Sequence, residues 1–329
     1  GLNAQSGSFQ LPGGIPFDYS GLTNGATINV NGSAVADTLN FQHDNTLPAA
    51  TINFDGGADA TNDTLNMTGT AAVTNETHNA TGAGAGTIEL DGTTTINFTR
   101  LEPVIDTIPA TNFVFNTPAG GNVVNYGNGA AGQHLISSPT SAFESVAFSN
   151  KTNVTVNTGL GADNVDVSTT QQAAGLATLT INTGAENDTV NVQLPFNGGV
   201  NLTAFDVDGG LGNDSLNIVG PAGNNDYSIS TNSVAVSGDQ TIGFSGITDL
   251  DVNTGDGSDN ANVQLGAGPG QITVDGGSGT TTVAIQGTGA DEAWNVTPSD
   301  PTQGGDSLVV VGGQTVRARA VSGPLALTD

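Results

Sequence analysis

The sequence predicts an all-β protein, and more narrowly a parallel β-helix (a β-solenoid) with coils of about 22 to 26 residues. Three observations support this interpretation. A long segment occurs twice, a shorter unit of strand and corner recurs along the chain, and the corners are rich in Gly, Asn and Asp. Together they are typical of an architecture in which successive coils stack on one another.

The long repeat joins two strands through a Gly-rich corner. Its first copy covers residues 144–167 and reads ESVAFSNKTNVTVNTGLGADNVDV. Its second copy covers residues 240–263 and reads QTIGFSGITDLDVNTGDGSDNANV. The copies align without a gap at an offset of 96 residues. Such repetition favours a long structural or binding surface over a catalytic pocket.

The short unit sets the length of a coil. One aliphatic residue precedes each corner, and these residues are Val156, Ile181, Val207, Val252 and Val274. The steps between them are 25, 26, 45 and 22 residues, and the strand-like residues 227–229 divide the longest step. A V-x-V segment places alternate side chains on opposite faces, while corner Gly accepts a left-handed backbone. We therefore expect strands inside each coil and turns at its corners.

We expect one elongated repeat domain over residues 1–329, with sub-repeats at about 15–143, 144–239 and 240–329. Two stretches, residues 70–86 and residues 298–305, are predicted to be loop insertions. The segments that begin at Ile15 and Gln314 both resemble the second half of the long repeat. The chain therefore either continues into neighbouring coils or stacks on copies of itself, and a head-to-tail contact that does not close builds a filament.

Composition and charge exclude several functions. The chain has 48 Gly, is 5% aromatic and contains no Cys, so disulfide and thiol chemistry are excluded. Regular aliphatic alternation favours a folded protein over the disorder that such a composition also allows. The net charge is −27, and the cations are Arg100, Lys151, Arg317 and Arg319. We therefore expect no binding to nucleic acid or anionic membrane. The acidic surface suits divalent metal, a polycationic partner or a saline medium, or serves solubility alone.

The corners resemble the Gly- and Asp-rich calcium repeats (RTX-type) of large secreted bacterial proteins. The best match is GGLGNDSLN, residues 209–217, and the corners at 158–163 and 254–259 differ from it at the first Gly. The resemblance implies Ca²⁺ as a cofactor, because turn carbonyls and Asp carboxylates hold it in that family. The candidate ligands are Asp163, Asp188, Asp214, Asp259, Asn157, Asn182, Asp208 and Asn253.

This chain departs from the family in having one such corner per coil in place of tandem nonapeptides. The alternative is that the Asp and Asn side chains form hydrogen-bonded ladders without metal. The longer repeat also resembles segments of very large cell-surface proteins of environmental bacteria, including planctomycete-like ones. Glycosylation sequons are numerous, and chance explains many of them in a chain rich in Asn and Thr. Those at Asn75 and Asn79, in a predicted polar loop, are the best candidates.

No pattern predicts an enzyme. His43, His78 and His134 are scattered, and no nucleophile motif or phosphate-binding loop occurs. No apolar run approaches the length that spans a membrane, so we expect no membrane insertion. The sequence predicts a secreted structural protein at the cell surface, forming a head-to-tail filament, stalk or coat with copies of itself. The alternatives are an adhesin that binds surface polysaccharide and a calcium-triggered secretion module.

Overall fold

Strands form where aliphatic and polar residues alternate along the chain. The computed structural model describes residues 6–9, 17–20, 25–44, 49–58, 63–289, 293–297 and 306–328. In β17 (Thr178–Asn182) the residues are alternately half-buried and buried, and the same pattern recurs along most strands. The five aliphatic residues that precede the corners, Val156, Ile181, Val207, Val252 and Val274, are all at most 1% exposed. Each therefore lies in the core, as the period-two pattern predicts.

The prediction of an all-β protein is confirmed. Among the described residues the helical structure consists of one 3₁₀ turn, η1 (Asn197–Gly199). Within the same ranges no helix combines the length and hydrophobicity needed to cross a membrane.

The chain divides into two compact units. Unit 1 contains Gly1–Gly159 and Gln171–Leu179, and unit 2 contains Leu160–Thr170 and Thr180–Asp329. Strand β17 has residues in both units. The sub-repeat boundaries expected from the sequence stay a prediction.

Unit 1 is built from two sheets whose strands are mostly parallel. The first sheet runs in the order β3 (Ala26–Asn31), β5 (Ala50–Asp55), β9 (Thr94–Thr99), β8 (Ala85–Leu90), β7 (Val73–Gly82), β11 (Ala110–Asn116) and β15 (Lys151–Asn157). The second runs β4 (Thr38–Gln42), β6 (Thr64–Thr68), β10 (Val104–Asp106), β14 (Val146–Phe148), β13 (His134–Ser137) and β12 (Val123–Asn128). A separate antiparallel pair consists of β1 (Ser6–Phe9) and β2 (Phe17–Ser20).

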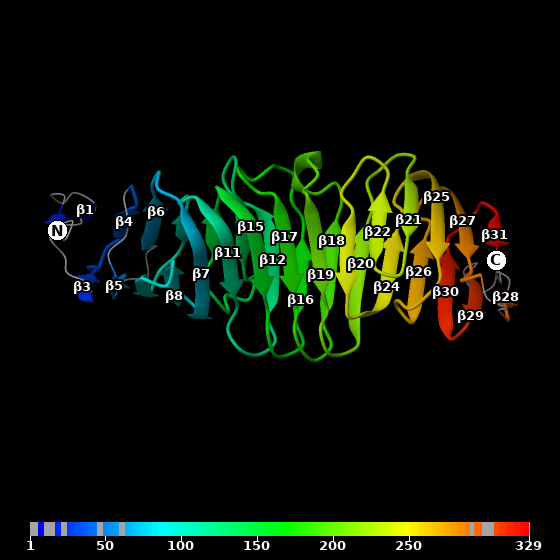
Figure 1. Ribbon diagram of the computed structural model, residues 1–329, viewed down its shortest axis with the longest axis horizontal. Helices are drawn as coiled ribbons and strands as arrows, with labels where there is room; N and C mark the ends of the chain where they lie inside the picture. The colour runs from blue at the N-terminus through cyan, green and yellow to red at the C-terminus, as the bar shows by residue number, and fades with distance from the viewer. Residues whose placement is uncertain are drawn as a thin grey trace. The chain divides into compact units, whose positions relative to one another are not determined.

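Unit 2 also has two sheets, and Figure 1 shows neighbouring strands such as β18 and β20 side by side. One sheet runs β16 (Asn164–Val167), β18 (Thr189–Gln193), β20 (Asp214–Val219), β24 (Ile247–Asn253), β26 (Gln271–Asp275), β30 (Gln314–Arg319), β29 (Ser307–Val311) and β28 (Asn295–Thr297). The other runs β19 (Ala204–Asp208), β23 (Ile242–Ser245), β22 (Ser233–Val236), β21 (Asp226–Ile229), β25 (Gly257–Gln264), β27 (Gly279–Gln286) and β31 (Leu325–Thr328).

Antiparallel triplets interrupt the parallel order. They are β7–β8–β9, β12–β13–β14, β21–β22–β23 and β28–β29–β30. Where no triplet intervenes, hydrogen-bonded side chains on stacked strands are 22 to 26 residues apart, as predicted for one coil. Across β21–β22–β23 the spacing rises to 34 residues, because the extra strands lengthen the coil.

The triplet β21–β22–β23 also moves the sequence repeat from one sheet of unit 2 to the other. Val207 lies in β19, whereas Val252 and Val274 lie in β24 and β26 of the other sheet. The sequence had placed all three in one stack, with residues 227–229 as the intervening coil. The structure corrects this. Residues 226–245 form three strands in the sheet of β19, and only then does the chain enter the other sheet at β24.

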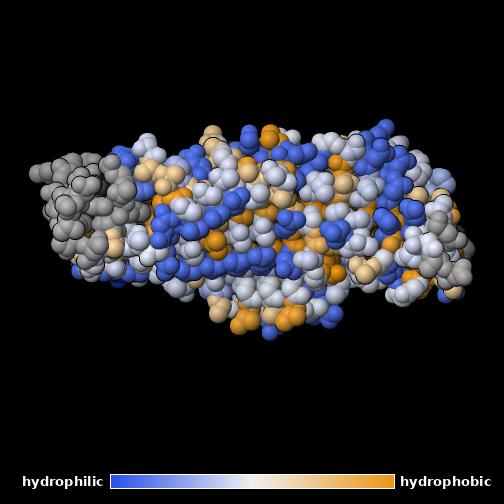
Figure 2. Space-filling model, viewed as in Figure 1, coloured by the Kyte–Doolittle hydropathy of each residue, from blue (hydrophilic) through white to orange (hydrophobic). Residues whose placement is uncertain are grey.

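Ladders of Asn side chains follow the outward faces of the stacked strands. In unit 1, Asn97 Nδ2 donates to Asn53 Oδ1 over 2.8 Å, and Asn53 Nδ2 donates to Asn29 Oδ1 over 2.7 Å. In unit 2, Asn217 and Asn191 continue the same pattern at 2.7 Å. Such ladders form because parallel in-register strands bring identical side chains above one another. Figure 2 shows hydrophilic residues interspersed with apolar ones across the visible face.

Candidate functional site

The corner aspartates of unit 2 form a hydrogen-bonded ladder. Asp163, Asp188 and Asp214 are each at most 3% exposed. The backbone N–H of Asp163 donates to Asp188 Oδ1 over 2.8 Å, and the N–H of Asp188 donates to Asp214 Oδ1 over 2.9 Å. Each contact joins two corners that lie 25 or 26 residues apart in the sequence. The three residues are therefore brought together as stacked neighbours, and the hydrogen-bonded alternative describes their contacts.

The second oxygen of these carboxylates faces the interior. Asp188 Oδ2 and Asp214 Oδ2 are buried and have no hydrogen-bond partner among the described residues. Burial raises the pKa of Asp214, because the charged form loses hydration. A Cβ added at Gly209 would lie 2.7 Å from Asp214 Cβ and 2.9 Å from Oδ2. The first position of this corner motif, residue 209, is therefore Gly because the buried carboxyl group of Asp214 occupies the space that a side chain would need.

The corner also turns an apolar residue outward. Leu160 and Leu211 are 61% and 77% exposed, and each forms an isolated parallel bridge with Ala185. The corner therefore buries its carboxylate and exposes its Leu. This orientation points Asp163, Asp188 and Asp214 away from solvent.

Asp259 lies apart from this ladder. Its Oδ1 accepts the backbone N–H of Asn225 over 2.9 Å, and its neighbour in register on β27 is Thr281. The cause is the transfer of the repeat between sheets at β21–β22–β23, which places the Asp259 corner between β24 and β25. Asp214 instead begins β20, at the end of the corner that follows β19, whereas Asp259 lies within β25.

Three of the four other predicted ligands close turns or extend ladders. Asp208 Oδ1 accepts the N–H of Gly210 and the hydroxyl of Ser245, and Asn253 Oδ1 accepts the N–H of Gly255 over 2.8 Å. Asn157 Nδ2 donates to Asn116 Oδ1 over 2.7 Å. Asn182 is half-buried at the end of β17.

A calcium ion needs about six to eight oxygen ligands. Among the described residues, the Asp188 and Asp214 corners each leave one carboxylate oxygen without a hydrogen-bond partner, so a full shell would also need oxygens from turn carbonyls or water. Calcium at the corners stays a prediction.

A different set of titratable groups meets in the core of unit 1. Glu76 and His78 lie on β7, Asp106 ends β10 and Lys151 begins β15, and all four are at most 2% exposed. Lys151 Nζ lies 2.5 Å from Glu76 Oε2 and 3.0 Å from Asp106 Oδ1, and it donates to the carbonyl of Ile108 over 2.7 Å. His78 Nε2 lies 3.0 Å from Glu76 Oε1 and 3.4 Å from Asp106 Oδ2. We call these four residues the buried charge cluster.

The charges of the cluster depend on one another. Lys151 lowers the pKa of Asp106, whereas burial and the nearby Asp106 raise the pKa of Glu76 to about 7. The two carboxyl groups raise the pKa of His78 and Lys151 against the effect of burial. Lys151 and Asp106 thus form an ion pair, while Glu76 Oε1 and His78 Nε2 are joined by a hydrogen bond of 3.0 Å.

Glu76, His78 and Asp106 are a group of three in the described part of the chain whose potential metal-ligand atoms lie within 4.8 Å of one another. The ammonium of Lys151 already lies against two of them. The group therefore carries its own cation.

Sequence reasoning missed the cluster because it treated residues 70–86 as a loop. In the structure these residues form β7 and part of its hairpin with β8. The period-two pattern is present, but two inward positions hold Glu76 and His78 where other coils have aliphatic residues. Two features of the sequence could have indicated the cluster. One is the Glu-x-His spacing at inward positions of a period-two pattern, and the other is the single lysine of the chain, Lys151.

The strand also corrects the position of the two glycosylation candidates. Asn75 is exposed and Asn79 is half-buried, and both lie on β7. Asn75 Oδ1 accepts from Asn112 Nδ2 over 2.9 Å, and Asn79 Oδ1 accepts from Asn116 Nδ2 over 2.7 Å. They are members of Asn ladders and do not lie in a loop.

No family model matches this chain, and no curated protein shows significant similarity to it.

Proposed function

We propose that this protein is a secreted structural subunit whose coils form a parallel β-solenoid and which adds to copies of itself, head to tail, through the edges of its sheets. The observation that carries the proposal is the in-register stacking of identical side chains, as in the ladder of Asn29, Asn53 and Asn97. A surface that repeats itself along the stacking direction offers the same contacts to a further coil.

The last strand of unit 2 has the features of a surface for strand addition. Val283 N–H donates to the carbonyl of Pro324, and Gly287 N–H donates to that of Thr328. Because hydrogen bonds alternate along a parallel pair, the N–H groups of Leu325 and Leu327 point away from β27. Leu327, which lies in register with the buried Ile285, is 37% exposed. Among the described residues, this edge thus combines backbone N–H groups that point away from β27 with the exposed apolar side chain of Leu327.

The first parallel strand of unit 1 offers a matching edge. Ile28 and Val30 of β3 lie in register with the buried Ile52 and Phe54 of β5. Both are half-buried, although their partners are at most 2% exposed. Strand addition would cover these side chains and pair the free backbone groups, which is the physical basis of β-augmentation.

The assembly test uses sedimentation velocity and negative-stain imaging over a range of concentrations. We expect the wild type to form linear particles, and Leu327→Pro to stay monomeric, because Pro removes an N–H that points to the free edge. Leu327→Val keeps that N–H and is the matched control, expected to assemble. A wild type that is monomeric at every concentration, or a Leu327→Pro variant that assembles as the wild type does, would contradict the proposal.

A further inference from the structure

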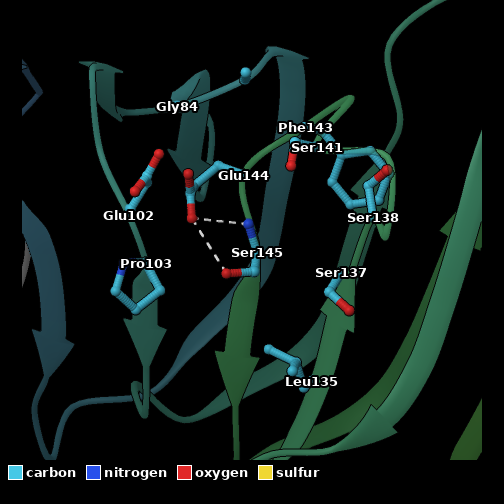
Figure 3. A pocket seen from close by; sticks show the side chains of 11 residues that line it. Gly84, Glu102, Pro103, Leu135, Ser137, Ser138, Ser141, Phe143, Glu144 and Ser145 are labelled. Carbon is cyan, nitrogen blue, oxygen red and sulfur yellow. Dashed lines mark hydrogen bonds between the residues drawn. The ribbon is translucent and has the colours of Figure 1, made fainter. Parts of the chain in front are cut away.

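A hollow of about 440 Å³ opens on the surface of unit 1, where β10 and β14 begin and β13 ends. Its lining combines two carboxylates, Glu102 and Glu144, with serine hydroxyls and with apolar groups of Pro103, Leu135 and Phe143. In Figure 3 the side chains of Glu102 and Glu144 lie close together on one side of the hollow, and serines border the other.

Glu144 is built into the wall of the hollow. The residue is 6% exposed, and its Oε1 accepts the backbone N–H of Ser145 over 2.9 Å and the hydroxyl of the same residue over 3.2 Å. Its Oε2 accepts no hydrogen bond from a described residue. Burial, reinforced by the nearby charge of Glu102, raises the pKa of Glu144 to about 7. The two are the titratable groups of the lining.

None of the Lys and Arg side chains, all of which lie in the described part of the chain, pairs with Glu102 or Glu144. The chain has four Lys and Arg residues, and all lie against other acids. Arg100 pairs with Asp55, Lys151 with Glu76 and Asp106, and Arg317 and Arg319 with Asp306. A buried carboxylate that faces a second carboxylate is stabilised by a positive charge between them. A cation that binds the ionised pair would therefore come from outside the four Lys and Arg side chains of the chain.

The same unit shows what such a pair accepts. In the buried charge cluster, the ammonium of Lys151 lies between the carboxyl groups of Glu76 and Asp106 and over the ring of Phe113, 5.4 Å from the ring centroid. The hollow has the two carboxylates and the apolar wall, but it is open and lacks the lysine.

We propose that the hollow binds the primary ammonium group of an aliphatic amine, such as a lysine side chain, between Glu102 and Glu144. The serine hydroxyls can accept the remaining ammonium hydrogens. Pro103 and Leu135 would contact the methylene stem, as apolar surfaces do for lysine elsewhere. This site is independent of assembly through the sheet edges.

The test measures binding of N-acetyl-lysine methylamide to the full chain at pH 8 by NMR. Glu144 is then mostly ionised, while the amine, with a pKa of about 10.4, remains charged. We expect saturable binding, a lowered pKa of Glu144 in the complex, and at least a tenfold weaker affinity for Glu144→Gln, because a buried ion pair loses one partner. Glu102→Gln changes an exposed residue and is expected to fold normally and also to bind more weakly.

Two controls separate this site from general attraction to an acidic protein. Glu89→Gln removes one exposed carboxylate of unit 1 outside the hollow and is expected to bind as the wild type does. N-acetyl-norleucine methylamide has the stem without the charge and is expected not to bind. Equal binding of the norleucine probe, unchanged affinity of Glu144→Gln, or a response to calcium chloride with none to the lysine probe would overturn the proposal.

Discussion

Replacement of Lys151 by Met is the sharpest test of the buried charge cluster. The Lys151 side chain is 0% exposed, and its three ammonium hydrogens are matched by Glu76, Asp106 and the carbonyl of Ile108. Methionine is unbranched, apolar and able to fill much of the same space, so the change mainly removes the charge that lies over the ring of Phe113. It leaves two buried carboxyl groups and a buried carbonyl without their donor.

We expect Lys151→Met to lower the free energy of unfolding by about 3–5 kcal/mol at pH 7, the usual cost of removing one partner from a buried ion pair. Arg100→Met is the matched control. It also removes one cation, but the Arg100 and Asp55 side chains are 57% and 36% exposed, so we expect a loss below about 1 kcal/mol. Urea unfolding followed by circular dichroism measures both. Equal losses in the two variants would refute the ion pair as described.

The same variant has a defined pH dependence. Without Lys151, the pKa values of both Glu76 and Asp106 in the folded state are expected to lie above those of the unfolded chain. A carboxyl group of this kind stabilises the fold below its unfolded pKa and loses that contribution as the pH rises through its folded pKa. In the wild type, the lowered pKa of Asp106 has the opposite effect, and its contribution is lost as the pH falls. We therefore expect the deficit of Lys151→Met to be smaller at pH 5 than at pH 8.

Two further predictions concern the corners. Gly209→Ala is expected to lower the free energy of unfolding by about 1–3 kcal/mol, because the added Cβ would lie 2.7 Å from Asp214 Cβ. Gly82→Ala, whose added Cβ would have no atom within 4 Å, is the control and is expected to be close to neutral. Thermal unfolding compares the two variants, and an unchanged stability of Gly209→Ala would contradict this packing. The pKa of Asp214 is raised in the fold, so its ionised form is destabilising and its contribution to stability is lost as the pH rises through that pKa. Asp214→Asn is therefore expected to be more stable than the wild type at pH 7 and to lose this advantage near pH 3. On this reasoning, excess chelator leaves the melting temperatures of both the wild type and the variant unchanged. Destabilisation of the wild type by chelator, abolished in Asp214→Asn, would instead establish calcium at the corners.

The sequence was sufficient where a local pattern has a local cause. Alternation of aliphatic and polar residues determines which side chains are buried, so Ile181 and Val274 could be placed in the core from spacing alone. The corner motif could be recognised because Gly209 has a steric role against Asp214 in the same turn. The stack of Asp163, Asp188 and Asp214 followed from their spacing of about one coil.

The pattern failed where inward positions hold charged residues. Glu76 and His78 occupy core positions of β7 but look like loop residues, because a buried ion pair depends on partners that are distant in sequence. Lys151 lies 75 residues from Glu76, and nothing in either neighbourhood marks the pair. The hollow beside Glu144 was missed for the same reason, since Glu102 approaches Glu144 only through the pairing of β10 with β14.

By itself the sequence determined that the protein is built from strands, which residues face the core, and where the chain turns, since these depend on neighbouring residues and on side-chain size. The tertiary structure alone decided which strands are neighbours where an antiparallel triplet intervenes. The triplet β21–β22–β23 moves Val252 into the other sheet from Val207, and this separates Asp259 from the ladder of Asp214. Which strands become neighbours depends on how many consecutive strands the chain adds to one sheet before it enters the other. No local sequence pattern specifies that number.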